Sequence, residues 1–192
     1  SGLSVMSNST DWRISFDQCP NDTLVKLKQI KLLCLDVDGV LTDGSLLFDA
    51  DGETLKRFNT LDGLGIKALQ KAGIEVAIIS GRKSKMVTTR ASNLGIEHII
   101  QGRDDKWPAL IDLLAELNLT PEQTAHMGDD LPDLPLINRC AIGISVPNAH
   151  PALAQHSQWV TSRSGGNGAV REACELILHA RGELSALIES YL

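Results

Sequence analysis

The sequence predicts an α/β protein built around a Rossmann-like, doubly wound parallel sheet with helices on both faces. Short apolar runs at residues 31–37 and 74–79 have the composition of strands buried on both sides. Between such runs the leucines follow helical spacing, as at Leu110, Leu113, Leu114 and Leu117. The 192 residues are 43% hydrophobic, so the chain is long and apolar enough to form one sizeable core.

Strand and helix signals alternate along the chain, as a parallel sheet with crossover helices requires. Further apolar runs predict strands at residues 97–100, 124–127 and 140–144. Helical spacing, capping residues and terminal glycines predict helices at residues 22–30, 61–72, 106–117 and 168–182, and another that begins near Leu131. We expect one domain at residues 22–182, a flexible N-terminal arm at residues 1–21 and a C-terminal tail at residues 183–192.

One segment interrupts this alternation directly after the first predicted strand. Residues 45–48 and 53–58 are extended stretches that flank the turn sequence Asp49-Ala50-Asp51-Gly52. Two such stretches around a glycine-containing turn are typical of a β-hairpin. We therefore expect a small hairpin insertion at about residues 45–58.

Composition excludes several classes of protein. The net charge of -6 argues against a general nucleic-acid-binding protein, which would carry a basic stripe. No run approaches the roughly 18 apolar residues that span a bilayer, and the start of the sequence lacks the pattern of a signal peptide. The cysteines, which lack zinc-ligand spacing and predict buried, reduced thiols, are Cys19, Cys34, Cys140 and Cys174. We expect a cytoplasmic protein with no nucleic-acid or membrane partner.

Two carboxylates, Asp36 and Asp38, follow the first predicted strand, and Gly39 comes next. The carboxyl ends of parallel strands form the edge of a sheet where ligands bind. Two acids this close repel each other unless a cation lies between them, and Mg²⁺ readily combines carboxylate ligands with phosphate and water. The pair therefore predicts a magnesium-dependent phosphate site. An acidic surface turn is the alternative, which the preceding apolar strand disfavours.

The next three predicted strands are also followed by residues that suit a phosphate site. Ser80 ends the second strand, where its hydroxyl and the following N–H groups can hold a phosphate oxygen; a helix N-cap is its alternative role. Lys106 follows the third strand and can act as a cation on phosphate, although most lysines are simply solvated. Asp129 follows the fourth strand and is expected to be a third metal carboxylate. Asp130 and Asp133 are equally suited to bonding the loop or capping the next helix.

These four signals, in this order, resemble the haloacid dehalogenase superfamily of phosphotransferases over about residues 31–180. The motifs of that superfamily are DxD, then Ser or Thr, then Lys, then an acidic GDxxxD. The resemblance implies that Asp36 attacks phosphorus to form an aspartyl-phosphate, while Asp38 protonates the leaving oxygen and then activates water. It implies Mg²⁺ held by Asp36, the backbone carbonyl of Val37 or Asp38, and Asp129. Contacts to the phosphoryl oxygens are implied for Ser80 and Lys106.

Within that superfamily the chain is similar to the capless members. The hairpin fills the first position where a cap domain would be inserted, and the gap from Ser80 to Lys106 holds one helix and one strand. The chain contains the strings LDVDGVLTDG (35–44), RFNTLDGLGI (57–66), ISGRKS (79–84), GRDDK (102–106), GDDLPDLP (128–135) and GGNGAVREACELIL (165–178). Together they resemble the 3-deoxy-D-manno-octulosonate 8-phosphate phosphatases of lipopolysaccharide synthesis.

This narrower resemblance implies hydrolysis of that sugar acid phosphate by a homotetramer. Hairpins from the four subunits would assemble into a barrel, and a neighbouring subunit would do the work of the missing cap. The resemblance implies substrate contacts from Asp38, Asn59, Thr60, Leu61, Asp62, Gly63, Arg82, Arg90 and Lys106. Guanidinium groups suit a sugar acid because they pair a carboxylate through two hydrogen bonds.

Three other functions stay open at this point. The substrate could be a nine-carbon sugar acid phosphate, since the shape of the pocket decides between the two. A non-catalytic oligomeric scaffold is disfavoured because the motif residues Asp36, Asp38, Ser80, Lys106 and Asp129 are all present. Phosphoryl transfer to an acceptor other than water is disfavoured because there is no cap to exclude water.

Overall fold

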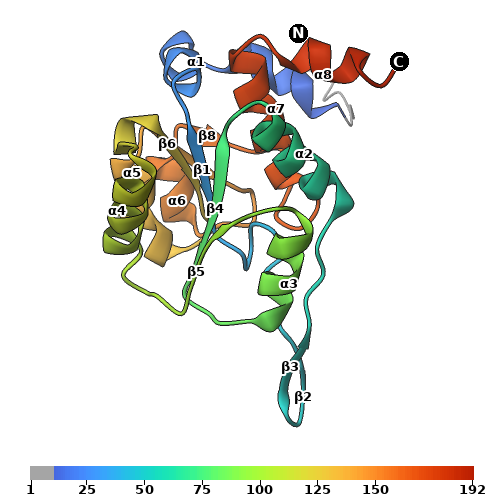
Figure 1. The fold of residues 1–192 in the computed structure, drawn as a ribbon, viewed down its shortest axis with the longest axis vertical. Coiled ribbons are helices and arrows are strands. Elements are labelled where there is room, and N and C mark those ends of the chain that lie inside the picture. The colour runs from blue at the N-terminus through green and yellow to red at the C-terminus, as the bar shows by residue number, and fades with distance from the viewer. Residues whose placement is uncertain (1–10) are drawn as a thin grey trace, which may run out of the picture.

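The computed structural model describes residues 11–192, whose centre is a six-stranded parallel sheet (Figure 1). In space the strands run in the order β5-β4-β1-β6-β7-β8. Along the chain they are β1 (Leu32–Leu35), β4 (Glu75–Ser80), β5 (His98–Gln101), β6 (Thr124–Met127), β7 (Ile142–Ser145) and β8 (Trp159–Val160). The predicted α/β fold is confirmed, and β8 is a short strand that the sequence pattern did not indicate.

The direction of strand addition reverses at β1, in the middle of the sheet. From β1 the chain moves outward to β4 and β5, then returns to β6 on the other side and continues to β7 and β8. Cys34 of β1 pairs with Ala77 of β4 and with His126 of β6, which fixes the register on both sides. In doubly wound sheets ligands bind at the carboxyl ends of the strands beside such a reversal. The ends of β1, β4 and β6 are therefore the expected place for a site.

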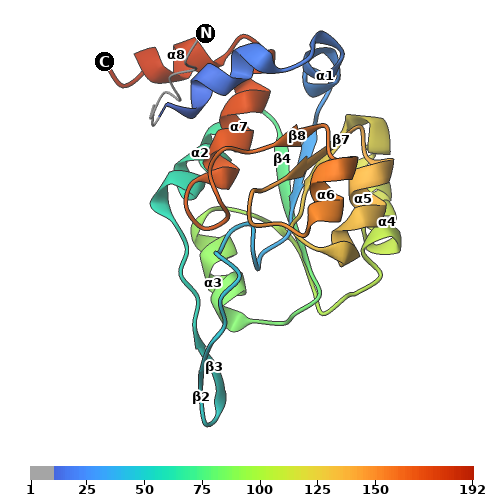
Figure 2. The same ribbon diagram turned by 180° about the vertical axis from the view of Figure 1, so that it is seen from behind.

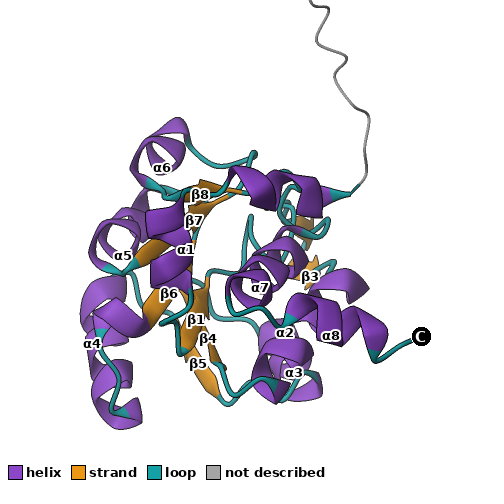
Figure 3. Cartoon of the chain, turned by 90° about the horizontal axis from the view of Figure 1, so that it is seen from above, coloured by secondary structure: helices purple, strands orange, loops and turns teal. Residues whose placement is uncertain are grey.

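Helices cover both faces of this sheet (Figure 3). One apolar cluster joins Leu33 and Leu35 to the helices α2 (Thr60–Lys71), α3 (Lys85–Asn93) and α7 (Ala169–Ala180). The other joins Leu32 and Cys34 to α4 (Lys106–Leu117) and α5 (Leu134–Arg139). Alternate residues of β1 thus point to opposite faces, as expected for a strand buried on both sides. Three further short elements are η2 (Pro121–Gln123), η3 (Leu131–Asp133) and α6 (Pro151–His156).

The predicted hairpin is present as β2 (Leu47–Asp49) and β3 (Gly52–Leu55). It projects from the body of the molecule, away from α1 (Asn21–Leu27) and α8 (Leu184–Glu189) (Figures 1 and 2). Its strands are shorter than expected from residues 45–58. The hairpin leaves several large apolar side chains in solvent, with exposed fractions between 41% and 62%: Leu46, Leu47, Phe48 and Leu55.

Both ends of the described chain pack onto the body. The first element, η1 (Trp12–Gln18), buries Phe16 against α7, where its ring centroid is 5.4 Å from that of His179. The expected flexible arm was residues 1–21, and the structure differs from it over residues 11–21, because Phe16 is part of the core. The helices α1 (Asn21–Leu27) and α8 (Leu184–Glu189) also pack onto the body, and each buries a leucine. Residues 1–10 lie outside the described residues, and the boundaries at residues 22 and 182 stay predictions.

The four cysteines are buried and unpaired, as their scattered spacing predicted. In residues 11–192 no helix is both long enough and apolar enough to cross a membrane.

Candidate active site

The carboxyl ends of β1, β4 and β6 border a cleft of about 260 Å³. Six predicted site residues line it: Asp36, Asp38, Ser80, Arg82, Lys106 and Asp129. Each one lies at or just after the end of a strand, or at the start of α4. Because parallel strands end at the same edge of the sheet, the fold brings together residues that are far apart in the sequence.

The turn after β1 presents the two DxD carboxylates to this cleft. The N–H of Asp36 donates to the carbonyl of Met127 at 3.0 Å, so pairing with β6 continues as far as the candidate nucleophile. The Val37 carbonyl then accepts the N–H groups of residues 40–42 within 3.1 Å. Gly39 has φ +87°, and a Cβ there would lie 1.9 Å from Asp129 Oδ2. Only glycine allows this turn and the close approach of Asp129.

Carboxylate oxygens of Asp36, Asp129 and Asp133 lie within 4.8 Å of one another. Burial, followed by the nearby Asp133 carboxylate, raises the pKa of Asp36 well above its ordinary value. Burial likewise raises the pKa of Asp129 to about 6. Acids placed this way resist ionising together unless a cation lies between them, and carboxylate oxygens are the ligands that Mg²⁺ prefers. The pair of Asp36 and Asp129 therefore fits a divalent cation.

A backbone carbonyl can complete this set of ligands. The sequence left Val37 and Asp38 open for this role. The Val37 carbonyl already accepts three N–H groups, whereas the Asp38 carbonyl accepts no hydrogen bond within residues 11–192. Of the two, the Asp38 carbonyl is the one available to a metal.

Lys106 begins α4 and is only 4% exposed. Its Nζ lies 3.2 Å from Asp36 Oδ1 and 2.9 Å from Asp133 Oδ1. Burial lowers the pKa of Lys106, but the charges of Asp36 and Asp133 outweigh that effect and raise the pKa above its ordinary value. A permanently charged ammonium group thus sits beside the candidate nucleophile.

The Asp133 carboxylate links Lys106, His126 and the loop after β6 through hydrogen bonds. Its Oδ1 accepts a hydrogen bond from the Lys106 ammonium group and lies 2.8 Å from His126 Nε2. Its Oδ2 accepts hydrogen bonds from the N–H groups of Asp129 and Asp130 at 3.1 and 3.4 Å. Burial opposes ionisation, but the hydrogen bond and charge of His126, then those of Lys106, outweigh it and lower the pKa of Asp133 below its usual range. Asp130 instead caps η3, where it accepts the first N–H at 2.8 Å. The sequence left two roles open for these acids: Asp133 bonds the loop, and Asp130 caps the short helix that follows.

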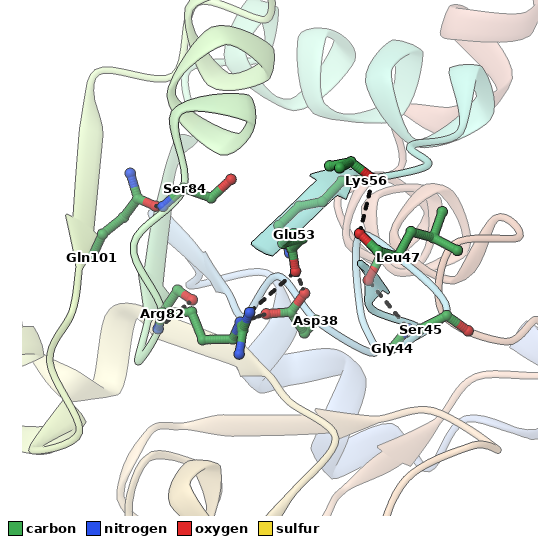
Figure 4. A network of polar contacts seen from close by, with 12 residues as sticks. Asp38, Gly44, Ser45, Leu47, Glu53, Lys56, Arg82, Ser84 and Gln101 are labelled. Carbon is green, nitrogen blue, oxygen red and sulfur yellow. Dashed lines mark hydrogen bonds and ion pairs between the residues drawn. The ribbon is translucent and has the colours of Figure 1, made fainter. Parts of the chain in front are cut away.

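The Asp38 carboxylate belongs to an ion-pair network that includes two hairpin residues (Figure 4). Lys56 Nζ lies 2.7 Å from Asp38 Oδ1 and 3.0 Å from Glu53 Oε1. Arg82 Nη2 lies 3.1 Å from Glu53 Oε2, and its Nε lies 3.7 Å from Asp38 Oδ2. Glu53 and Lys56 were not predicted, because the alternation of side chains in a hairpin strand does not show which residues the hairpin will contact.

Ser80 ends β4 and is 2% exposed, with its Oγ accepting the N–H of Arg82 at 3.3 Å. The N-cap of the following helix, α3, is Ser84. The alternative role of Ser80 as a helix N-cap is therefore wrong, and its hydroxyl lies in the wall of the cleft.

A distant loop braces the turn after β1, and it too was missed. Asn148 Nδ2 donates to the Gly39 carbonyl at 3.0 Å, and its Oδ1 accepts the N–H of Gly165 at 2.9 Å. A Cβ on Gly165 would lie 1.9 Å from the Gly39 carbonyl oxygen, so this contact requires glycine. No local signal marks Asn148, because its bond to Gly39 spans 109 residues.

The other predicted substrate contacts gather at a second place. Thr60, Gly63 and Arg90 line a groove formed by α2, α3 and α8. Arg90 donates to the Asn59 carbonyl at 3.4 Å and lies over the ring of Phe58. Neither residues 59–63 nor Arg90 line the cleft that contains Asp36. Within one chain these two groups of predicted contacts are separate.

Asp62 is the member of this second group that is tied to the core. It is 2% exposed, and its Oδ1 accepts the N–H of Arg171 at 3.0 Å, at the start of α7. The N-cap residue of α7, Gly168, offers no side-chain cap, so Asp62 supplies one from α2. Burial raises the pKa of Asp62 to about 6, and the N–H of Arg171 offsets this only in part. Its Oδ2 has no hydrogen-bond partner in the described part of the chain.

Asp62→Asn is expected to flatten the pH dependence of stability between about pH 4 and pH 6. The folded chain keeps the Asp62 proton up to a pKa of about 6, whereas the unfolded chain loses it near 3.8. The free energy of unfolding of the wild type therefore falls as pH rises through this window, by up to about 3 kcal/mol from this group. Urea denaturation of the metal-free proteins at several pH values measures the difference. Asp112→Asn, an exposed site on α4, is the control; curves for wild type and Asp62→Asn that stay parallel would contradict the expectation.

Known proteins resemble this chain over most of its length. The sequence profile of the haloacid dehalogenase-like hydrolases matches residues 88–172. The 3-deoxy-D-manno-octulosonate 8-phosphate phosphatase KdsC of Escherichia coli is 47% identical over 163 residues, which cover 85% of this chain and 87% of the relative.

Solved structures agree with this. The 3-deoxy-D-manno-octulosonate 8-phosphate phosphatase from Moraxella catarrhalis, in complex with magnesium ion, phosphate ion and KDO, superposes with a TM-score of 0.87 at 47% identity. The match covers 90% of this chain and 99% of that one. The cobalt-bound deoxy-D-mannose-octulosonate 8-phosphate phosphatase from Haemophilus influenzae gives 0.82 at 44% identity, over 84% and 94% of the two chains. With such relatives, this chain belongs to the 3-deoxy-D-manno-octulosonate 8-phosphate phosphatase family of the haloacid dehalogenase-like hydrolases.

Proposed function

We propose that this protein is a Mg²⁺-dependent phosphatase that converts 3-deoxy-D-manno-octulosonate 8-phosphate to 3-deoxy-D-manno-octulosonate and inorganic phosphate. The cleft carries this conclusion, because it joins Asp36, Asp38, Lys106 and Asp129 in a chain 47% identical to phosphatases of that name. The related structure from Moraxella catarrhalis holds magnesium, phosphate and KDO, which supports the metal and both products. We assign the reaction to lipopolysaccharide biosynthesis.

In the first half of the reaction, a carboxylate oxygen of Asp36 attacks phosphorus and the ester P–O bond breaks, which leaves an aspartyl-phosphate. Asp38 gives its proton to the departing sugar oxygen, so the sugar leaves as a neutral alcohol. Lys106 and Ser80 are placed to stabilise the non-bridging phosphoryl oxygens. Asp36, the Asp38 carbonyl and Asp129 would hold Mg²⁺, which would supply positive charge to offset the negative charge of the acids and of the phosphoryl group.

In the second half, the Asp38 carboxylate takes a proton from a water molecule while the water oxygen attacks phosphorus. The bond from Asp36 to phosphorus breaks and inorganic phosphate leaves. Asp38 is protonated again at the end, ready for the next substrate. The Asp38 carboxyl group transfers a proton in both halves of the reaction, so both depend on its orientation in the cleft.

Phosphate release from a panel of substrates tests this function. The panel contains the proposed substrate, a nine-carbon sugar acid 9-phosphate and a neutral hexose phosphate, each with Mg²⁺ and with a chelator. We expect release to require the metal and kcat/KM to be at least about 10-fold higher for the proposed substrate. A preference for the nine-carbon substrate would move the specificity and keep the chemistry. Folded protein that releases no phosphate from any substrate with Mg²⁺ would favour the hypothesis of a non-catalytic scaffold.

We further propose that the protein is a homotetramer assembled through its hairpins. The exposure of Leu47, Phe48 and Leu55 supports this, because such apolar groups on a projecting element are typical of an interface. The position of residues 59–63 and Arg90 outside their own cleft is consistent with contacts to a neighbour's substrate. We also propose a cytoplasmic location, which the four unpaired thiols support.

Phe48→Ser combined with Leu55→Ser is expected to lower the oligomeric state. Two apolar contacts are removed from the hairpin while the sheet is untouched, so circular dichroism should stay unchanged. Sedimentation velocity should show smaller species, and kcat/KM should fall by about 10-fold or more because the neighbour no longer helps to position the substrate. Val25→Ser, which removes a 59% exposed apolar side chain from α1, is the control. A double variant that sediments like the wild type would contradict the role of the hairpin.

A further inference from the structure

The ammonium group of Lys56 is buried where the hairpin meets the cleft. Lys56 directly follows β3, and its side chain is only 1% exposed. A charge removed from water in this way is costly unless it is paired at close range. Its two partners, Asp38 Oδ1 at 2.7 Å and Glu53 Oε1 at 3.0 Å, satisfy that requirement. Lys56 is therefore held in one place and cannot swing freely into solvent.

Arg82 closes the same network from the other side (Figure 4). Glu53 gives one oxygen to Lys56 and the other to Arg82 Nη2, at 3.1 Å. Arg82 is far more exposed than Lys56, 47% against 1%, and its Nε stays 3.7 Å from Asp38 Oδ2. That distance is too long for a hydrogen bond. The two oxygens of Asp38 are thus unequal, since Oδ1 is held tightly by Lys56 and Oδ2 is not.

We propose that Lys56 is a positioning residue for Asp38: it holds Oδ1, so that Oδ2 is the oxygen that passes the proton to the leaving sugar and later takes one from water. An ammonium group can only donate hydrogen bonds, so the oxygen that accepts from Lys56 is poorly suited to carry a proton at the same time. Rotation of the carboxyl group about its Cβ–Cγ bond would exchange the two oxygens, and the contact with Lys56 prevents this. Glu53 supports Lys56 and thereby links the hairpin to the acid. This inference rests on the proposed role of Asp38 in the phosphatase reaction.

The test compares two substrates whose leaving groups differ in their need for a proton. The sugar alkoxide of 3-deoxy-D-manno-octulosonate 8-phosphate must be protonated as it leaves, whereas p-nitrophenolate leaves p-nitrophenyl phosphate without help. For Lys56→Met we expect kcat/KM to fall by about 100-fold or more on the sugar phosphate, the usual worth of a general acid. On p-nitrophenyl phosphate we expect a fall of less than about 10-fold. The ratio kcat/KM reports steps up to aspartyl-phosphate formation, so the later use of Asp38 as a base does not enter it.

Three further variants make this comparison decisive. Lys56→Arg keeps a cation and should recover part of the loss on the sugar phosphate. Glu53→Gln keeps the shape but weakens the hold on Lys56, so it should show the same bias to a smaller extent, even if Lys56→Met folds poorly. Lys26→Met, on the exposed face of α1, is the control and should change neither substrate.

Two results would overturn the proposal. Equal losses on both substrates would mean that Lys56 supports the fold or contacts the phosphoryl group itself. Unchanged activity on the sugar phosphate would mean that Asp38 needs no such support. If the wild type instead prefers another alkyl phosphate, the proposed substrate is wrong, and the same comparison run with that alkyl phosphate still decides the role of Lys56.

Discussion

Asp36→Asn is expected to abolish phosphate release while leaving the protein folded. The amide cannot attack phosphorus. Loss of the nucleophile from a site whose residues act as a unit lowers kcat by about four orders of magnitude or more. Phosphate release from 3-deoxy-D-manno-octulosonate 8-phosphate under saturating Mg²⁺ measures the loss. The variant should also fail to form any acid-stable phosphoryl-protein, which can be followed with radiolabelled substrate.

The same variant has an expected effect on stability. The pKa of Asp36 is raised because its carboxyl group is buried beside other acids, so removing the charge should not weaken the metal-free fold. The added stability that Mg²⁺ gives should shrink, because one of its carboxylate ligands is lost. Thermal unfolding with and without Mg²⁺ measures both effects. Asp104→Asn alters another acid in the wall of the cleft and should stay within a few-fold of wild-type activity. An active Asp36→Asn protein would refute the assignment of the nucleophile.

Asp133→Ala is expected to give the largest loss of stability of any acid in the cleft. The Asp133 side chain is 1% exposed, forms ion pairs with Lys106 and His126, and accepts hydrogen bonds from two backbone N–H groups. Truncation leaves the Lys106 charge without one partner, and such losses cost about 3–5 kcal/mol. Because Lys106 and the loop that carries Asp129 both lose their support, kcat/KM should fall by about 100-fold or more as well. Urea denaturation and phosphate release on the same samples measure the two effects.

Asp130→Ala is the matched control, since it removes a carboxylate from the same loop. Asp130 is exposed and only caps η3, so its loss should cost about 1 kcal/mol and little activity. A difference of several kcal/mol between the two variants is therefore expected. Similar denaturation curves for Asp133→Ala and Asp130→Ala would show that the buried network contributes little to stability.

The sequence alone predicted five of the six strands of the sheet and six residues that line the cleft. Asp36, Ser80, Lys106 and Asp129 could be found because each lies at the end of, or after, an apolar run with the composition of a buried strand, and because the four come in the order of the superfamily motifs. In a parallel sheet the ends of such strands meet at one edge, so positions in the sequence translate into neighbours in space. The order of the strands, with β1 between β4 and β6, then sets which of these ends are adjacent.

Other parts of the molecule could not be predicted in this way. The packing of η1 was missed because one buried ring, Phe16, leaves no periodic pattern. The sequence could not divide the roles of Asp130 and Asp133, since residues three apart in a loop exchange roles with small changes of backbone direction. Asn148 was missed because its two partners come from separate loops.

The sequence by itself thus determined the fold class and the placement of Asp36, Asp129 and Lys106 at one edge of the sheet, because local hydrophobic patterns fix the strands and the strands fix where their ends lie. Only the tertiary structure decided how the proton-transferring Asp38 is held. Lys56 and Glu53 reach it because the return strand of the hairpin ends beside Asp38, and this placement depends on contacts between segments that are distant in the sequence. The charge of Lys56 stays buried only because those contacts pair it, and no property of residues 52–58 read in isolation shows that they do.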